Sequence, residues 1–120
     1  LQDEFQMSMM MITHDLSVIA LMADDVVVMY LGHVVEKAPV EDIFYAPGHP
    51  YTQALLQSVP RVGVKGKLKQ IEGTVPNPMT VRRGCPFAAR CPSAMPRCFQ
   101  EEPPVFALTE RHSVKCWLHE

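Results

Sequence analysis

The fold is decided by the stretch Val26-Val27-Val28-Met29-Tyr30-Leu31-Gly32-His33-Val34-Val35-Glu36-Lys37. Residues 26–30 are mostly β-branched or aromatic, a composition typical of a strand. Residues 31–33 contain a glycine and predict a tight turn, and residues 34–37 predict a second strand. The stretch therefore predicts a β-hairpin.

The segment before the hairpin predicts a strand followed by a helix. Residues 7–13 are almost continuously apolar, which is typical of a strand covered on both faces, as in a parallel sheet. A buried helix segment is the alternative, but seven residues are short for one. Asp15 is a good N-cap, and apolar residues then recur at helical spacing until Asp24-Asp25. His14 lies between the two elements.

The segment after the hairpin predicts two short helices. The first covers residues 41–45, with Pro39 suited to its first turn. Pro47-Gly48-His49-Pro50 interrupts it, and the second covers residues 51–58. The order strand, helix, strand, hairpin and helices is that of the end of an α/β domain.

The composition changes after residue 60. Residues 61–72 hold four basic side chains and two glycines and predict an exposed linker, a nucleic-acid or anionic-lipid patch being the alternative. The net charge of −2 argues against nucleic-acid binding. We expect three parts: residues 1–60, with the start of an extension from about residue 39, the linker 61–72, and a small irregular extension over residues 73–120. Because the chain begins without methionine, we also expect it to be part of a longer protein.

All four cysteines lie in the extension, at Cys85, Cys91, Cys98 and Cys116, spaced C-x5-C-x6-C-x17-C. Two disulfides would hold such a segment together, but only in an oxidising compartment. Four thiolates could instead bind zinc or an iron–sulfur cluster. Four free buried cysteines acting as small apolar residues are the remaining alternative. His112 or His119 could replace a thiolate in a zinc site, although we expect both at the surface.

Three segments together resemble the end of the ATP-binding subunit of ABC importers for oligopeptides and dipeptides. The first is Ile12-Thr13-His14-Asp15-Leu16, followed by Ala23-Asp24 and the hairpin. The second is His49-Pro50-Tyr51-Thr52 with its flanking residues Ile43-Phe44, Pro47, Leu55-Leu56 and Ser58-Val59-Pro60. The third is Ile71-x-Gly73-x-x-Pro76 with Gly84-Cys85-Pro86-Phe87, Arg90-Cys91-Pro92 and Cys98.

The resemblance implies roles for specific residues. His14 matches the switch-loop histidine, which contacts the γ-phosphate of ATP and helps to position the attacking water; a single donor matters there because phosphoryl transfer depends on positioning and charge stabilisation. The four cysteines match positions that bind a [4Fe–4S] cluster with a structural role, with zinc as the alternative, and a cytoplasmic location disfavours disulfides. His49-Pro50-Tyr51 is expected to be structural rather than catalytic.

The chain lacks most of an ATPase site. It contains no G-x-x-x-x-G-K-[ST] loop, no signature segment and no Walker B carboxylates, so we expect ATP and Mg²⁺ to bind only to the intact protein. The resemblance implies a peripheral position on the cytoplasmic face of the membrane. The implied partners are two transmembrane permease subunits, a second ATP-binding subunit and an extracytoplasmic solute-binding protein. A free-standing metal-binding interaction module is the alternative function.

Overall fold

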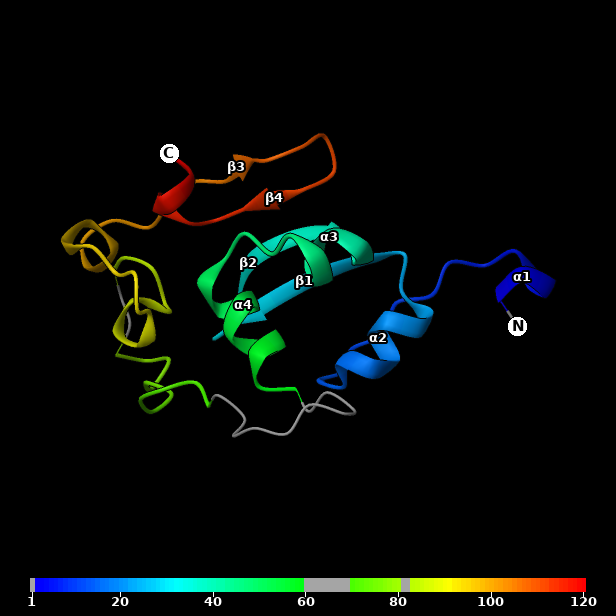
Figure 1. Cartoon of the computed structure of the whole chain (residues 1–120), viewed down its shortest axis with the longest axis horizontal. Coiled ribbons are helices and arrows are strands. Elements are labelled where there is room, and N and C mark those ends of the chain that lie inside the picture. Colours follow the sequence, from blue (N-terminus) through cyan, green and yellow to red (C-terminus); the bar gives the residue numbers. More distant parts are fainter. Residues whose placement is uncertain (1, 60–69, 81–82) are drawn as a thin grey trace.

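The computed structural model describes residues 2–59, 70–80 and 83–120, which form a small α/β structure (Figure 1). Most of the predicted linker therefore lies outside the described residues. The α-helices are α1 (Gln2–Phe5), α2 (Leu16–Met22), α3 (Val40–Tyr45) and α4 (Pro50–Gln57), and the 3₁₀ helices are η1 (Ala88–Arg90), η2 (Pro96–Phe99) and η3 (Trp117–His119). The strands are β1 (Asp25–Tyr30), β2 (His33–Pro39), β3 (Phe106–Ala107) and β4 (Ser113–Val114).

The predicted hairpin is confirmed by the antiparallel pairing of β1 with β2. Leu31 and Gly32 have φ angles of 48° and 78°, the left-handed conformation that a two-residue type I′ turn requires. The pairing changes register between Val28 and Met29, so that Val35 is left without a partner as the extra residue of a β-bulge. As a consequence, the consecutive residues Val35 and Glu36 are both buried.

The prediction of a buried strand over residues 7–13 is wrong. This segment has no regular structure, and the side chains of Met10 and Ile12 are 90% and 95% exposed. A strand forms only beside another strand, and none of the described strands pairs with it. The helix that follows is confirmed as α2, and the Asp15 carboxylate caps it by accepting from the backbone N–H groups of Ser17 and Val18 (2.9 and 3.4 Å).

The two helices predicted after the hairpin are confirmed as α3 and α4. Pro39 is the residue before α3 rather than part of its first turn. Pro50 begins α4, where its missing N–H has no cost. The helices lie against the hairpin in Figure 1, and α3 contacts both β1 and β2.

The cysteine region, which we define as residues 83–120, adds two strands to the hairpin. β4 pairs antiparallel with β2, and β3 pairs with β4, giving a sheet of order β1-β2-β4-β3. The Lys115 N–H continues this pairing by donating to the Val35 carbonyl (2.8 Å). Strands of two residues carry no repeating pattern, and the sequence therefore predicts only an irregular extension here.

The hydrophobic core is continuous between the hairpin, α4 and the cysteine region. Tyr30 of β1, Tyr51 of α4 and Phe87 form an aromatic cluster with ring centroids 4.7–5.3 Å apart. Phe87 is 1% exposed, so its ring is the apolar anchor of the cysteine region on the hairpin. Across the described ranges, no helix has the length and apolar character that a bilayer crossing requires.

Candidate metal centre

All four cysteines line one pocket, although the first and the last are 31 positions apart in the sequence. Cys85 precedes η1, Cys91 follows it, Cys98 lies in η2 and Cys116 precedes η3. All four are free thiols, so the structure has no disulfide among them. The remaining lining residues come from both halves of the chain: His49, Pro50, Phe87, Ala88, Ser93, Pro103, Trp117 and Leu118.

A glycine brings the first and third cysteines together. The Cys85 N–H donates to the Cys98 carbonyl (2.7 Å), which places η2 directly against the start of the cysteine region. Gly84 has a φ of 77°, and a Cβ at this position would collide with the Cys98 carbonyl oxygen. Both the backbone conformation and the close approach therefore require glycine at residue 84.

Every one of the four sulfurs interacts with a backbone N–H group. The N–H groups of Phe87, Ser93 and Leu118 bond to Cys85, Cys91 and Cys116, in each case two residues earlier. The fourth sulfur, that of Cys98, accepts from the Met95 N–H (3.4 Å). Donors directed at sulfur stabilise a thiolate, the form of cysteine that binds metals.

The pocket nevertheless disfavours thiolates that have no counter-charge. Burial raises the pKa of Cys85 to about 11 and also raises the pKa of Cys91 and Cys116, and the neighbouring sulfurs add to each rise. Without a positive charge between them, these thiols remain protonated at neutral pH. The arrangement can therefore bind a cationic group in exchange for protons.

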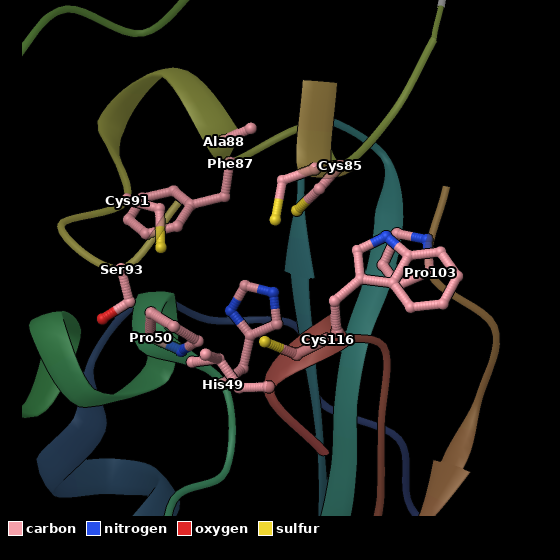
Figure 2. A pocket seen from close by; sticks show the side chains of 12 residues that line it. His49, Pro50, Cys85, Phe87, Ala88, Cys91, Ser93, Pro103 and Cys116 are labelled. Atoms are coloured by element: carbon pink, nitrogen blue, oxygen red, sulfur yellow. The ribbon is translucent and has the colours of Figure 1, made fainter. Parts of the chain in front are cut away.

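The geometry of the pocket limits what it can bind. Within residues 2–59, 70–80 and 83–120, no three or more His, Cys, Asp or Glu side chains are placed to ligate one metal ion. The side chains of Cys85, Cys91 and Cys116 nevertheless point into the same space (Figure 2). The thiols thus surround a common centre, but they do not converge on a point.

His112 and His119 do not contribute to the pocket lining. His119 is half-buried, and its Nε2 lies 2.7 Å from the Gly48 carbonyl. The prediction that both histidines lie at the surface is wrong for His112, which is 3% exposed. Its burial is explained by a bond between its Nε2 and a carboxylate oxygen of Glu36 (2.6 Å).

Glu36 organises a buried polar network next to the pocket. One carboxylate oxygen accepts from the Gly48 N–H (2.6 Å) and from His112, and the other accepts from the His49 N–H (3.1 Å). A Cβ on Gly48 would lie 3.2 Å from this carboxylate and 2.9 Å from the Leu108 side chain, so a larger residue would require both side chains to shift. The network fixes the turn before α4 to β2 and to the end of the chain.

The His49 ring is buried between this network and the four cysteines. Its Nδ1 caps α4 by accepting from the Tyr51 N–H (3.0 Å). Burial is the main cause that lowers its pKa to about 4, and the ring is therefore neutral at physiological pH. The cap and the packed Tyr51 ring agree with the structural role predicted for His49-Pro50-Tyr51.

His14 lies away from the cysteines, exposed in the loop before α2. The Thr13 hydroxyl oxygen beside it accepts from the Asp15 N–H (3.0 Å), which shapes the turn into the helix. The structure thus brings the four predicted metal ligands together and leaves the predicted catalytic histidine on a separate surface.

The sequence matches the family described as oligopeptide/dipeptide transporter, C-terminal region, over residues 35–98. The chain belongs to this family, which confirms the resemblance that its motifs indicate.

Similar proteins are ATP-binding transport proteins. Oligopeptide transport ATP-binding protein AppD of Bacillus subtilis is 46% identical over 98% of this chain. Dipeptide transport ATP-binding protein DppD of the same organism is 46% identical over 100%, and oligopeptide transport ATP-binding protein AmiE of Streptococcus pneumoniae is 46% identical over 98%. The chain spans 36%, 36% and 34% of these proteins, about a third of their length.

Proposed function

We propose that this chain is the C-terminal part of the ATP-binding subunit of an ABC importer for peptides or related small solutes. The observation that carries the proposal is the family match over residues 35–98, together with relatives whose similarity covers the whole chain. ATP and Mg²⁺ would bind to the intact subunit, because residues 1–120 contain no phosphate-binding loop. The chain by itself would neither bind ATP tightly nor hydrolyse it.

In the intact subunit His14 would contact the γ-phosphate of ATP. Its position on an exposed loop, before a helix capped by Asp15, leaves the imidazole accessible to a nucleotide held by other parts of the subunit. A neutral imidazole can donate one hydrogen bond to a phosphate oxygen, and such donors stabilise the charge of the transition state.

The proposed assembly lies on the cytoplasmic face of the membrane. It contains two transmembrane permease subunits, a second ATP-binding subunit and an extracytoplasmic solute-binding protein, and no nucleic acid. ATP binding would close the two ATP-binding subunits and drive the permease between inward-facing and outward-facing states. The extension would stabilise the pair of ATP-binding subunits or couple them to the permease.

The test of this function replaces His14 in the intact subunit. We expect His14→Ala to slow ATP hydrolysis by about 100-fold to 1,000-fold, the usual cost of losing one transition-state donor, with ATP binding retained. His33→Ala, an exposed histidine in β2, is the matched control and should leave the rate unchanged. A normal rate of hydrolysis in His14→Ala would contradict the role.

We further propose that Cys85, Cys91, Cys98 and Cys116 bind a [4Fe–4S] cluster, with zinc as the alternative. The shared pocket and the backbone N–H group at each sulfur support a metal–thiolate site. A cluster is favoured over one ion because the family resemblance implies it, and because the larger body of a cluster tolerates widely spaced ligands. When bound, the cluster would connect η1, η2 and η3 and serve a structural role.

Anaerobic purification separates these alternatives. A cluster gives a brown protein with visible charge-transfer absorption and with iron and sulfide in equal amounts, whereas zinc gives a colourless protein with about one metal ion per chain. A chain that retains neither group would overturn the metal site without affecting the proposed transport role.

A further inference from the structure

The Nε2 atom of His49 is buried and has no hydrogen-bond partner among the described residues. His49 is 1% exposed, and its ring lines the pocket of the four cysteines (Figure 2). A buried polar atom without a partner costs about 1–3 kcal/mol, so its presence calls for an explanation. The role inferred for this atom rests on the proposed metal site.

The other ring nitrogen determines where the proton lies. Because Nδ1 accepts a hydrogen bond from the Tyr51 N–H, it carries no proton itself. The single proton of the neutral ring is then on Nε2. The atom that faces the cysteines is therefore an N–H donor, and it has no lone pair available for a metal ion.

The position of this donor is held from two sides. The His49 N–H donates to the Glu36 carboxylate (3.1 Å), which fixes the backbone to β2. The ring also packs against Phe87, with centroids 5.9 Å apart. Two elements far apart in the sequence thus hold the ring at a pocket that is lined by all four thiols.

We propose that the His49 Nε2–H group donates a hydrogen bond to a sulfur atom of the group that the four cysteines bind. His49 is then a positioning residue, outside the set of metal ligands. Hydrogen bonds to cluster sulfurs stabilise the more negative, reduced state and so raise the reduction potential. They also slow the loss of the bound group, because outer-shell partners typically contribute about 10-fold to 100-fold in metal affinity.

Two substitutions distinguish the helix cap made by Nδ1 from the hydrogen-bond donor at Nε2. His49→Asn keeps an acceptor near Nδ1 and remains a good helix cap, but it is too short to provide the Nε2 donor. His49→Gln places an amide N–H near the Nε2 position and loses the cap. His33→Asn removes an exposed histidine that does not line the pocket and is the control.

The full chain and each variant are purified anaerobically and reconstituted with ferrous iron and sulfide. Iron and sulfide contents, the rate of iron loss to a chelator and the reduction potential are then measured. We expect His49→Asn to bind the cluster, to lose it about 10-fold to 100-fold faster and to have a more negative potential. His49→Gln should lie close to the unaltered chain in potential, and His33→Asn should match it in all three measurements.

Three outcomes overturn the proposal. An unaltered chain without iron and sulfide removes the metal site as well as the role of His49. Equal potentials and release rates in His49→Asn and the unaltered chain remove the role of His49 alone. Equal changes in His49→Asn and His49→Gln would show that only the ring's packing matters.

A measurement on the unaltered chain covers the case in which the variants fail to fold. With ¹⁵N-labelled histidine, pulsed electron paramagnetic resonance of the reduced cluster should detect coupling to one ring nitrogen. A reduced cluster with no such coupling would overturn the proposal.

Discussion

The hairpin region (residues 16–59) and the cysteine region are held together by different interactions. The buried side chains of the hairpin region are mainly apolar, such as Val26, Val28 and Ile43. The cysteine region has 3₁₀ turns, two two-residue strands and a pocket of thiols, and its main apolar anchor on the hairpin is Phe87. The comparison shows a local β-hairpin serving as the support for a segment that cannot build a core of its own.

The contact between the two regions combines polar and apolar elements. On one side of it, Phe87 packs on Tyr30 and Tyr51; on the other, Glu36 binds His112 inside the protein. The pairing of β4 with β2 lies beside the buried Glu36–His112 bond, because Glu36 is itself paired with Val114. Each type of contact can be removed separately, and the following substitutions do so from the largest expected effect to the smallest.

Loss of the proposed metal group should separate the two regions most strongly. In Cys98→Ser we expect no metal to bind and residues 83–120 to lose their protection from hydrogen exchange, while β1 and β2 keep theirs. Structural metal sites contribute about 10–16 kcal/mol in zinc-finger peptides, which is more than a small region with few apolar contacts can replace. Hydrogen exchange followed by mass spectrometry tests this for each region.

The matched control for this variant is Ser93→Ala, which changes a pocket residue that is not a thiol. Its exchange should equal that of the unaltered chain. If the cysteine region stays protected in metal-free Cys98→Ser, apolar and polar contacts alone hold it in place.

Removing the apolar contact of Phe87 should have the next largest effect on the free energy of unfolding. Phe87→Ala removes a fully buried ring, and such changes lower the free energy of unfolding by about 3–5 kcal/mol. Phe99→Ala, where the side chain is 54% exposed, should change it by less than about 0.5 kcal/mol. Urea unfolding measures both values. Similar values for the two variants would contradict the role of Phe87 as an anchor.

Disrupting the polar contact made by Glu36 should lower the free energy of unfolding by a smaller amount. Glu36→Gln keeps the shape of the side chain but replaces one acceptor oxygen with a donor that faces other donors. We expect a loss of about 2–3 kcal/mol in the free energy of unfolding, as for a buried hydrogen bond to a charged group. Urea unfolding is again the measurement, and the exposed Glu110→Gln is the control. An unchanged midpoint in Glu36→Gln would show that the network adds no stability.

The smallest effect is expected at α2, which has no fully buried residue and contacts the core through the partly buried Ile19. Asp15→Ala removes the N-cap and should destabilise the helix by about 1 kcal/mol. The amide groups of Ser17 and Val18 should exchange faster, whereas those of the cysteine region should not change. Asp24→Ala, beyond the end of the helix, is the control. Faster exchange in the cysteine region would show that the two regions are coupled through α2.

The elements that the sequence predicts correctly are those formed by local interactions. The hairpin follows from β-branched residues around Leu31-Gly32, and α2 follows from apolar spacing after Asp15. Residues 7–13 have the composition of a strand, but a strand needs a neighbour, and composition cannot provide one. β3 and β4 are too short for any pattern.

The candidate site could be predicted only in part. Four cysteines in one irregular segment are visible in the sequence as a group, and the structure places them around one pocket. The roles of Glu36 and His112 depend on a β-bulge and on a contact 76 residues apart, and neither leaves a local signal. The donor direction of His49 is likewise determined by the Tyr51 N–H and is invisible in the sequence.

The bulge at Val35 decides what a deletion within β2 would do. Deleting this one residue would leave Val34 opposite Met29 and Glu36 opposite Val28, so the strand would alternate plainly with Glu36 still on the buried face. Insertions and deletions are usually tolerated in loops and rejected in strands because of pairing. In this protein, the loss of the Val35 codon would remove one buried apolar side chain from the core, while the Glu36 carboxylate would keep its place beside Gly48 and His49.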